Sequence, residues 1–600
     1  MRLQAKPSAD IRNTFLLLGD TLLKPTGYML HPTPLRLRLP LILAANIFFL
    51  LQSAAVIAQS TFLPLESISY HTIDRIEIKT AQLSDYVHTS VKPYTRLDAV
   101  LHNESADEAM LARFAKTDRQ YQYYTYRESS EWSDFGLIES KKPLFKNIYR
   151  YKTDFLHISQ YSDFMLKINP VLYWQVGKDL NSNGLRYINT RGVELRGMVS
   201  EKLGFYAYLG ENQAAFPQYV EQRIDQTLAV PGEGRFKEYN SRIGNNFFAP
   251  GRDYMTIKGY VTFQPIERIR IQFGHDKNFI GNGIRSLILS DFSNNYLFLK
   301  FNTQVWRFNY QNLFMQLTGQ YNTLGDSILP KKFAAIHHLS FNANKWLNIG
   351  LFESVVFGRQ NNQFELSYLN PLIFYRAAEF QLGSPDNVIL GLDYKANFAR
   401  HFSLYGQFII DEFKFNEIKN KTGWWANKLG MQVGLKYVDV AGISNLDAQI
   451  EYNTARPYTY SHQNTDGNYT HYNQPLAHPL GANFREVLAV LRYRTYKQMQ
   501  FKLNMMYAQY GADTDSTNWG SNIFLSNNSH MQDYNNHLLQ GIKTNILLTD
   551  FVWSFMWKHN LWFDVNTTLR RQKNDMGQIN TSKYIGCGIR LNIGRREMFF

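Results

Sequence analysis

The chain has 600 residues, with 64 Lys and Arg against 50 Asp and Glu, a formal net charge of +14 and 15% aromatic residues. Its mean hydropathy of -0.35 excludes a protein that crosses a membrane with a bundle of helices, and its single cysteine excludes an intrachain disulfide. The basic residues are scattered, which disfavours a nucleic-acid-binding protein, whereas the aromatic content suits a large β-protein, either soluble or a barrel with aromatic girdles at the membrane interfaces.

The only long apolar run lies near the N-terminus, from Leu41 to Ala58. Two arginines precede it and a small residue ends it, which is the pattern of a secretory signal that is cut after the run. A single membrane anchor is the alternative interpretation. The residues before Met29 do not resemble the start of a signal, so either translation begins there or the leader is unusually long. We expect residues 1–58 to be a signal peptide.

Residues 59–160 predict a small, mostly helical periplasmic segment. Ser105–Glu108 has the pattern of a capping box, and a helical run to Tyr121 follows it. Thr95 has the pattern of an earlier helix start, and partial alternation over Ile73–Ile78 predicts one short strand. An irregular linker is the alternative.

From residue 161 to the end, the sequence alternates with a period of two. Over Val388–Phe398 the apolar residues share one parity, while Asp393 and Lys395 lie on the other. Successive side chains of a strand point to opposite faces, and a tilted strand of about ten residues spans the hydrocarbon layer. One such strand also fits a soluble sheet, but about 18 of them in succession predict a membrane barrel.

Short and long connections alternate between the predicted strands. The short turns fall at residues 201–204, 264–267, 344–346, 399–401 and 439–444, and the long loops at 214–253, 275–295, 359–387, 414–428, 453–484 and 512–536. In bacterial outer-membrane barrels the short turns are periplasmic and the long loops are external. The predicted fold class is therefore all-β: a transmembrane antiparallel β-barrel over residues 161–600, in the outer membrane of a Gram-negative bacterium.

The last predicted strand fits this fold. Its apolar residues alternate with glycine and polar residues, and Cys587 falls on the apolar parity, where a small hydrophobic residue is suitable. The chain ends in Phe599 and Phe600, and a terminal aromatic after an amphipathic strand resembles the assembly signal of outer-membrane barrels. On the clearest strand, Val433→Arg on the lipid face should destabilise the barrel far more than Gln432→Arg on the lumen face.

The sequence contains no catalytic or metal-binding motif of the G-x-S-x-G, H-E-x-x-H or P-loop type. His337 and His338 are adjacent on a predicted strand, so they point to opposite faces and do not share a metal ion. We predict a protein with no catalytic activity, no metal and no cofactor. A barrel hydrolase would need a serine, a histidine and an acid on neighbouring strands, and nothing marks such a set.

Three polar segments follow predicted strands on the outer side, at residues 274–290, 368–387 and 473–483. The first two mix apolar and charged residues, which predicts that they fold inward and pack, either to close the lumen or to contact a ligand. The candidate ligand-binding residues are Asp276, Asn278, Asn282, Arg285, Phe374, Tyr375, Arg376, Glu379 and Asp386.

At these residues the chain resembles the Wzi-type capsule assembly proteins. The resemblance lies in the Gly-x-Gly and Ser-Leu-Ile-Leu-Ser pattern of Gly281–Ser290, in Asn370-Pro371 with Gly383–Asn387, and in Gly406–Glu412. It is closest to the branch called gliding motility protein RemB, and it covers most of residues 60–600. It implies an 18-stranded outer-membrane barrel with a small periplasmic helical part and a lectin-like role in attaching surface polysaccharide. The chain departs from the family in its longer N-terminal segment.

We therefore expect a monomeric, non-enzymatic barrel that binds or anchors surface polysaccharide in capsule assembly, gliding motility or both. The expected partners are surface or capsular polysaccharide, outer-membrane lipid and proteins of a gliding machinery, but no nucleic acid. The alternative is a porin-like transport channel, because Lys395, Asp447, Glu451 and Arg590 lie on the lumen parity and would suit a water-filled pore.

The basic total and two loop arginines lead to a hypothesis about the ligand. Arg285 and Arg376 would pair with the carboxylates of an acidic glycan, with Phe374 or Tyr375 stacked on sugar rings. The alternative is that Arg376 pairs with Glu379 or Asp386 and braces the loop.

Overall fold

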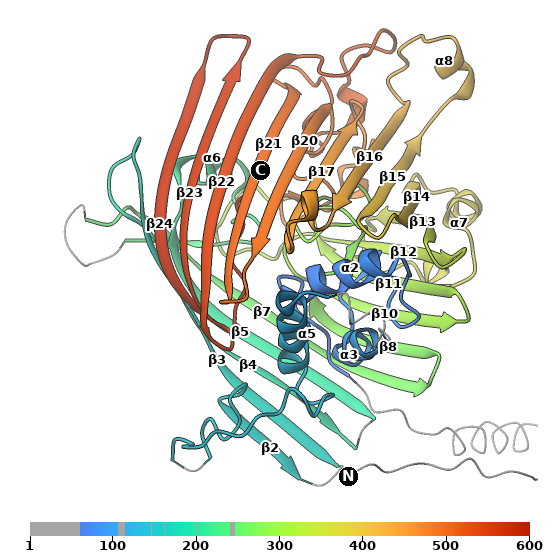
Figure 1. Ribbon diagram of the computed structural model, residues 1–600. Coiled ribbons are helices and arrows are strands. Elements are labelled where there is room, and N and C mark those ends of the chain that lie inside the picture. Colours follow the sequence, from blue (N-terminus) through green and yellow to red (C-terminus); the bar gives the residue numbers. More distant parts are fainter. Residues whose placement is uncertain (1–59, 106–113, 146, 161–162, 201, 241–246) are drawn as a thin grey trace, which may run out of the picture. The chain divides into compact units, whose positions relative to one another are not determined.

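The computed structural model describes residues 60–105, 114–145, 147–160, 163–200, 202–240 and 247–600 (Figure 1). Within these residues eighteen long antiparallel strands pair in chain order, and the last strand pairs with the first, so the sheet closes into a barrel and the predicted fold class is confirmed. The barrel strands are β3 (Phe164–Asp179), β4 (Arg186–Val199), β5 (Leu203–Ala215), β7 (Gly251–Ile266), β8 (Ile269–Asp276), β10 (Tyr296–Val305), β11 (Phe308–Thr318), β12 (Lys331–Asn342), β13 (Leu347–Phe357), β14 (Asn387–Phe398), β15 (Phe402–Glu412), β16 (Lys428–Tyr437), β17 (Leu446–Ala455), β20 (Phe484–Arg494), β21 (Met499–Ala512), β22 (Ile542–Lys558), β23 (Leu561–Asn574) and β24 (Ile579–Leu591).

Shorter elements lie before the barrel and in its loops. The helices are α2 (Ser69–Thr80), α3 (Arg96–Glu104), α5 (Lys116–Glu128), α6 (Gln218–Thr227), α7 (Tyr375–Leu382) and α8 (Phe415–Lys419). The 3-10 turns are η1 (Leu366–Leu369), η2 (Val440–Gly442), η3 (Thr465–Gly467) and η4 (Asn527–Ser529), and the short strands are β1 (Val91–Lys92), β2 (Leu156–Gln160), β6 (Lys237–Tyr239), β9 (Phe279–Ile280), β18 (Thr470–His471) and β19 (Gln474–Pro475). None of the helices in the described ranges is long and apolar enough to span a bilayer.

The part of the chain before the barrel, residues 60–160, is called the N-terminal segment below, and the described part of it is mostly helical. Thr95 caps α3 as predicted, because its side chain accepts a hydrogen bond from the Asp98 amide. The strand predicted at Ile73–Ile78 is wrong: these residues belong to α2, whose buried positions recur three and four residues apart. The predicted capping box falls mainly on residues 106–113, and the predicted signal peptide on 1–58, both outside the described residues.

The predicted alternation of faces is confirmed along the barrel wall. Asp393 and Lys395 are fully buried on the lumen side of β14, whereas Leu390 on the other parity is 42% exposed. Cys587 is exposed on the outer face of β24, as its parity predicts. The outer face is thus apolar and the inner face polar, which is the pattern of a barrel wall in lipid.

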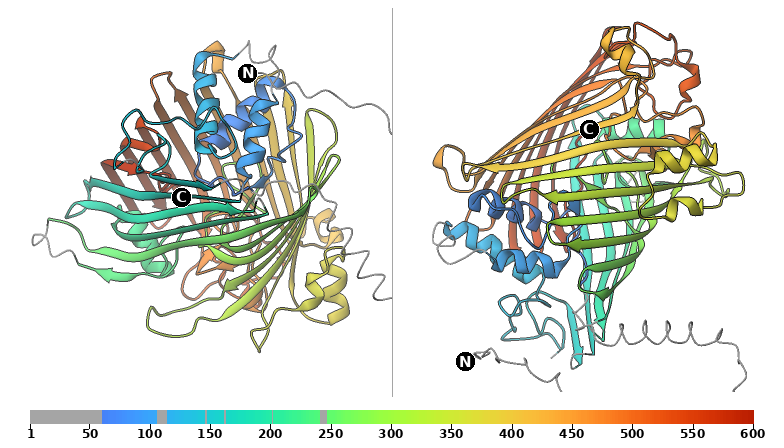
Figure 2. Two further views of the ribbon diagram at one scale, coloured as in Figure 1. Left: turned by 90° about the horizontal axis from the view of Figure 1, so that it is seen from below. Right: turned by 90° about the vertical axis from the view of Figure 1, so that its right-hand side faces the viewer.

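The short turns lie at one end of the barrel and the longer loops at the other, here called the short-turn end and the long-loop end. The N-terminal helices pack at the short-turn end (Figures 1 and 2). The amide of Leu83 bonds to the carbonyl of Lys345 in the β12–β13 turn at 2.6 Å. Tyr124 on α5 donates a 2.5 Å hydrogen bond to Asn560 in the β22–β23 turn.

Several long loops pack against the barrel and do not extend away from it. Residues 277–295, called the plug loop, and residues 456–483 fold into the lumen, where Leu287 and Leu476 are fully buried in one core. Residues 358–386, called the outer segment, instead lie on the outside of the barrel beside β13 (Figures 1 and 2). The prediction that this segment folds inward is therefore wrong.

The outer segment folds this way because the barrel wall offers it an apolar surface on the outside. Phe314, Phe333 and Val355 lie on the outward parity of β11–β13, and they bury Tyr368 and Tyr375 of the segment. Burial of aromatic side chains stabilises the loop wherever such a surface exists, and a sequence does not show on which side of the wall that surface lies.

Candidate functional site

The plug loop is held by its own backbone and by one inward side chain. Ser286 donates to the Ile280 carbonyl at 2.5 Å, which folds the loop back on itself. Gln407 on β15 accepts from the Leu287 amide at 2.7 Å and donates to the Ile280 carbonyl at 3.0 Å. The amide of Gln407 thus replaces a missing strand partner for the loop, whose backbone groups are buried and need partners.

The Gly-x-Gly pattern has a steric reason. A Cβ at Gly281 would lie 2.6 Å from the Gln407 amide nitrogen, and a Cβ at Gly283 would lie 2.5 Å from a carboxylate oxygen of Glu451. Gly281 also has φ +146°, a conformation that favours glycine. The Glu451 carboxylate accepts the amides of Ile284 and Arg285 at 2.6 and 3.0 Å, so the loop runs directly against the wall.

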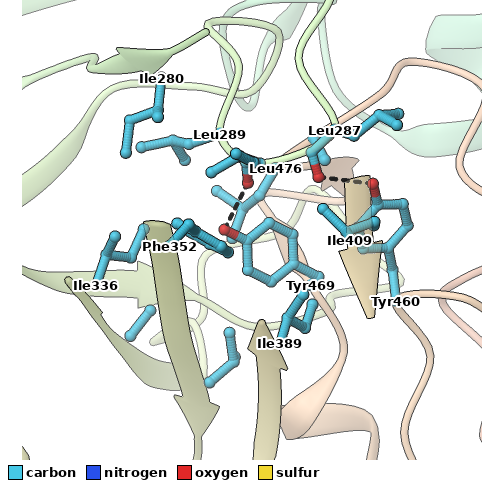
Figure 3. Close-up of a cluster of buried hydrophobic side chains, with 14 of the residues drawn as sticks. Ile280, Leu287, Leu289, Ile336, Phe352, Ile389, Ile409, Tyr460, Tyr469 and Leu476 are labelled. Carbon is cyan, nitrogen blue, oxygen red and sulfur yellow. Dashed lines mark hydrogen bonds between the residues drawn. The ribbon is translucent and has the colours of Figure 1, made fainter. Parts of the chain in front are cut away.

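The plug loop meets the second inward loop in an apolar core (Figure 3). Tyr460 donates to the Leu287 carbonyl and Tyr469 to the Ile288 carbonyl, each at 2.7 Å. Inward residues of the wall such as Ile409 complete this core. Packed side chains therefore fill the part of the lumen around this core.

Charged residues on the lumen parity bind the N-terminal segment. Lys395 on β14 donates to Glu77 of α2 at 2.5 Å, and Asp447 on β17 accepts from Arg75 and lies 2.8 Å from His71. These residues were expected to suit a water-filled pore. In the structure their charges are paired, which anchors α2 inside the short-turn end.

Residues 592–600, called the tail, also fold into the lumen. Arg595 pairs with Asp550 on β22 at 3.0 Å, and Phe600 is 4% exposed, with its ring 5.8 Å from that of Tyr219. The predicted assembly signal places the final aromatic at the end of the last strand. Here β24 ends at Leu591, and the terminal aromatic lies inside the barrel.

A cavity of about 590 Å³ remains in the lumen between the N-terminal segment, the plug loop, the tail and the wall. We call it the lumen chamber. Thirteen Lys and Arg line it against seven Asp and Glu, counted over the described residues. The cations are Lys92, Arg96, Arg196, Lys258, Lys277, Arg285, Lys436, Arg492, Arg494, Lys502, Arg590, Arg595 and Arg596.

Part of this positive charge is not neutralised by ion pairs. Among the described residues Lys92, Lys277, Arg492 and Arg494 of the lining form no ion pair; of the lining acids, this holds for Glu128 and Asp291. Burial, with nearby lysines, lowers the pKa of Lys92 to about 8. A cavity with excess buried cations favours an anionic occupant, because attraction is stronger where water is scarce.

Four of the predicted site residues lie in or beside the lumen. Asn278 and Asn282 are buried: Lys300 donates to the first at 3.0 Å and Thr89 to the second at 3.2 Å. Arg285 lines the chamber but pairs with Glu486 at 3.2 Å. These residues, together with the partly exposed Asp276 near Lys258, hold the plug loop in place.

The other five predicted residues lie on the outer segment, apart from the first group. Tyr375 is fully buried and stacks on His337 with ring centroids 4.1 Å apart, while Phe374 is 75% exposed. Arg376 pairs with Glu379 at 2.5 Å. Asp386 does not bind Arg376; it is held instead by Arg359 through both carboxylate oxygens and by the Tyr368 hydroxyl.

The chamber residues Lys92, Arg492 and Arg494 were not predicted as site residues. The two arginines lie on the lumen parity of β20, and that parity was their only signal in the sequence. Lys92 belongs to a strand of two residues that pairs with the plug loop, and nothing local marks it. Among the described residues no group of His, Cys, Asp and Glu is arranged to hold a metal ion.

Comparisons with known proteins agree with this geometry. Residues 176–575 match the family model described as Capsule assembly protein Wzi. The fold is similar to that of Wzi of Escherichia coli, described as an outer membrane protein involved in group 1 capsule assembly and a carbohydrate binding β-barrel. That similarity has a TM-score of 0.52 at 14% identity and covers 87% of this chain and 98% of that chain.

More distant similarities are found to other solved structures. OprD of Pseudomonas aeruginosa has a TM-score of 0.40 at 10% identity, covering 72% of this chain and 96% of that chain. OccAB2 of Acinetobacter baumannii has a TM-score of 0.39 at 9% identity, covering 71% and 97%. The comparison with curated proteins gave no match.

Proposed function

Because the chain belongs to the capsule assembly protein Wzi family, we propose that it is an outer-membrane barrel that binds surface polysaccharide in capsule assembly. In this proposal it acts in the outer membrane of a Gram-negative bacterium, as a monomer and without catalytic chemistry. Support comes from the Escherichia coli barrel of similar fold, which is described as a carbohydrate-binding protein of capsule assembly.

The observation that carries the ligand class is the charge of the lumen chamber. Its volume of about 590 Å³ can accommodate a short stretch of sugar units, and its lining has an excess of cations. An acidic glycan fits this lining, since each carboxylate can accept charge-assisted hydrogen bonds from Lys92, Arg492 or Arg494. We propose that one acidic end of the polymer enters the chamber and that repeated weak contacts elsewhere add retention.

A filled lumen favours binding over transport. The plug loop, residues 456–483 and the tail lie in the interior of the same barrel, and α2 is bound inside its short-turn end through Lys395 and Asp447. The porin-like alternative requires a continuous water path through these segments. Planar-bilayer recordings distinguish the two functions: we expect no steady ion conductance, and a wild-type barrel with porin-like conductance would support the channel instead.

The binding proposal is tested with the purified full chain and two polymers of equal length, a polyuronate and neutral dextran. Calorimetric titration should give heat with the polyuronate only, and the affinity should fall as salt rises. The double variant Lys92→Gln/Arg492→Gln should bind at least tenfold more weakly, because each charge-assisted hydrogen bond contributes on the order of 1.5–3 kcal/mol.

The control is Lys497→Gln, which removes a charge from the exposed turn between β20 and β21. It should bind like the wild type. The double variant should still fold, because Lys92 and Arg492 form no ion pair among the described residues. The nearby Asp74 keeps its partners Lys395 and Lys436. Equal binding of both polymers, or equal loss in both variants, would contradict the acidic ligand.

We propose that residues 1–58 are a cleaved signal peptide and that the N-terminal segment faces the periplasm. The resemblance of most of residues 60–600 to the RemB branch supports a further role in surface gliding, with gliding proteins as partners. Deletion of the gene should reduce capsule staining, surface movement or both, and a deletion strain normal in both would contradict both roles.

A further inference from the structure

The outer segment has a second apolar face that no described residue covers. Its inner face buries Tyr368 and Tyr375 on the outside of the barrel wall. Its outward face carries four large apolar side chains that are 73%, 84%, 75% and 86% exposed: Leu366, Leu372, Phe374 and Phe380. Four large apolar side chains exposed on one short segment point to surroundings other than water.

This face continues the apolar outer surface of the barrel. The Tyr310 hydroxyl donates to the Pro371 carbonyl, so the segment reaches Tyr310 on β11. Tyr310 pairs with Leu339, and Leu339 with Leu351, which is 55% exposed on the outer face. Pro371 of the segment therefore contacts the wall at the level of Leu351, which is a lipid-facing side chain of β13.

Polar groups on the wall show that the segment stays in place. His337 and Glu353 lie on the outward parity, where an exposed imidazole or carboxylate would face lipid. Tyr375 covers the His337 ring, and the Arg376 amide donates to Glu353 at 3.2 Å. Lifting the segment would expose both groups, so its outward face is the surface that the surroundings meet.

We propose that the outer segment is a lipid-binding element embedded in the membrane leaflet at the long-loop end. Leu372, Phe374 and Phe380 lie among acyl chains. Arg376, one helical turn before Phe380 and 72% exposed, uses one guanidinium nitrogen for Glu379, and its other N–H groups reach the phosphate headgroups, as long basic side chains do at membrane interfaces. The proposal rests on the membrane location of the barrel proposed above.

The test measures where these side chains lie in a bilayer, with the full chain reconstituted in phosphatidylcholine vesicles. Cys587 is the only cysteine of the chain and lies on the lipid face of β24, so a nitroxide attached there is the lipid reference. In a Cys587→Ser background, Phe374→Cys and Phe380→Cys place the nitroxide on the outer segment. Asp515→Cys, in the exposed loop before β22, is the aqueous reference.

Collision rates with oxygen, which concentrates in lipid, and with a water-soluble nickel chelate give the result. We expect labels at Phe374 and Phe380 to match Cys587, with high oxygen and low nickel access. Labels on the outer segment with the collision rates of the Asp515→Cys label would overturn the proposal. Labels shielded from both reagents would also overturn it, because they would indicate a protein partner or a second copy of the chain. If the Cys587 label itself meets nickel, the membrane location is wrong, and that failure is separate.

A second readout uses Arg376. In the same vesicles with added anionic phospholipid, the Phe380 label should move deeper or become less mobile, and Arg376→Gln should remove this response. A response unchanged by Arg376→Gln would overturn the headgroup contact. The Phe380→Cys protein, with and without Arg376→Gln, should show the normal heat-dependent gel shift of a folded barrel. The side chains of Phe380 and Arg376 are exposed and contribute little to packing.

Discussion

Some buried charges in the lumen are neutralised by specific partners, and Glu131 is an example. Glu131 of the N-terminal segment is 2% exposed at its side chain and lies 2.8 Å from Lys167 and 3.4 Å from Arg196. Burial alone would raise the pKa of Glu131, but Arg196, Lys167 and Arg96 lower it to about 2. This carboxylate therefore links the N-terminal segment to β3 and β4 in its ionised form.

We predict that Glu131→Gln lowers the free energy of unfolding by on the order of 3–5 kcal/mol, because it leaves buried cations without their partner. The lowered pKa of Glu131 means that its contribution is present above about pH 4.5 and is lost as the pH falls towards 2. Urea unfolding between pH 7 and 3 measures this.

The control for Glu131 is Glu139→Gln, an exposed acid that pairs with the exposed Arg150. It should leave stability unchanged at every pH. A Glu131→Gln protein with the stability and pH profile of the wild type would show that the buried pair does not hold the segment.

Lys92 makes ligand binding dependent on pH. Because the pKa of Lys92 is lowered to about 8, the side chain loses its proton as the pH rises through that value. Polyuronate binding should therefore weaken between pH 7 and 9. Lys92→Arg keeps its charge over this range and should bind with little change. Titrations at both pH values check this; a parallel fall in the Lys92→Arg protein would assign the effect to another group.

At the scale of single strands, the wall has two faces that tolerate charge differently. Val433 is 38% exposed on the outer face of β16, so Val433→Arg should cost about 2–4 kcal/mol, as charge near the bilayer midplane does. Gln500 lies on the lumen face of β21, lines the chamber and is opposite Arg494, so Gln500→Glu, which places an acid beside unpaired cations, should be mild. Folding yields in detergent compare the two, and equal yields would contradict the assignment of faces.

The sequence predicts that Gln432→Arg is a mild change on the lumen face, and the structure shows that this prediction is wrong. Gln432 is 1% exposed and donates to the Arg285 carbonyl at 3.0 Å and to Asn453 at 2.9 Å. Gln432→Arg would therefore displace the plug loop. Alternation identifies the inner face of a strand, but it does not tell whether that face meets water or a folded loop.

The elements that sequence reasoning missed have the same physical origin. The alternation of β14 or β16 is fixed by a local rule, the two-residue period of a strand, and it could be predicted. The charged residues of α2 pair with residues far away in the sequence, such as Asp447 on β17. Its local pattern is therefore weak and favours a strand. The outer segment packs on a surface made by three different strands, which no local pattern shows. Its signal was polar Glu353 on a lipid-facing parity.

At the scale of the whole molecule, topology can be tested with a matched pair of sites. Gly577 lies at the tip between β23 and β24 at the long-loop end, and Gly442 in the turn between β16 and β17 at the short-turn end. Both have positive φ and no neighbour within 4 Å of an added Cβ, so both accept an inserted tag. In intact cells an antibody should reach the tag at Gly577 and not the tag at Gly442.

Labelling of the Gly442 tag in cells that are not permeabilised would show that the barrel has the opposite orientation in the membrane. Residues 453–484 were expected to be the accessible loop, but most of them are buried in the lumen, so they are unsuitable for a tag. The barrel, its strand number and the alternation of turns follow from the sequence because they repeat along it. Which loops fill the lumen is decided by contacts between distant parts of the chain.

The pairing of β1 with β9 also connects the short-turn end of the barrel mechanically with the plug loop. Val91 pairs with Ile280, and the Gly281 amide bonds to the Ser90 carbonyl at 2.7 Å, so the N-terminal segment and the plug loop share one short ladder. A pulling force on α2 at the short-turn end loads this ladder. From Ile280 the load passes along the loop to Leu287 and the hydroxyl of Tyr460. A force on α2 would therefore load the plug loop through hydrogen bonds that connect the short-turn end with the packed core of the lumen.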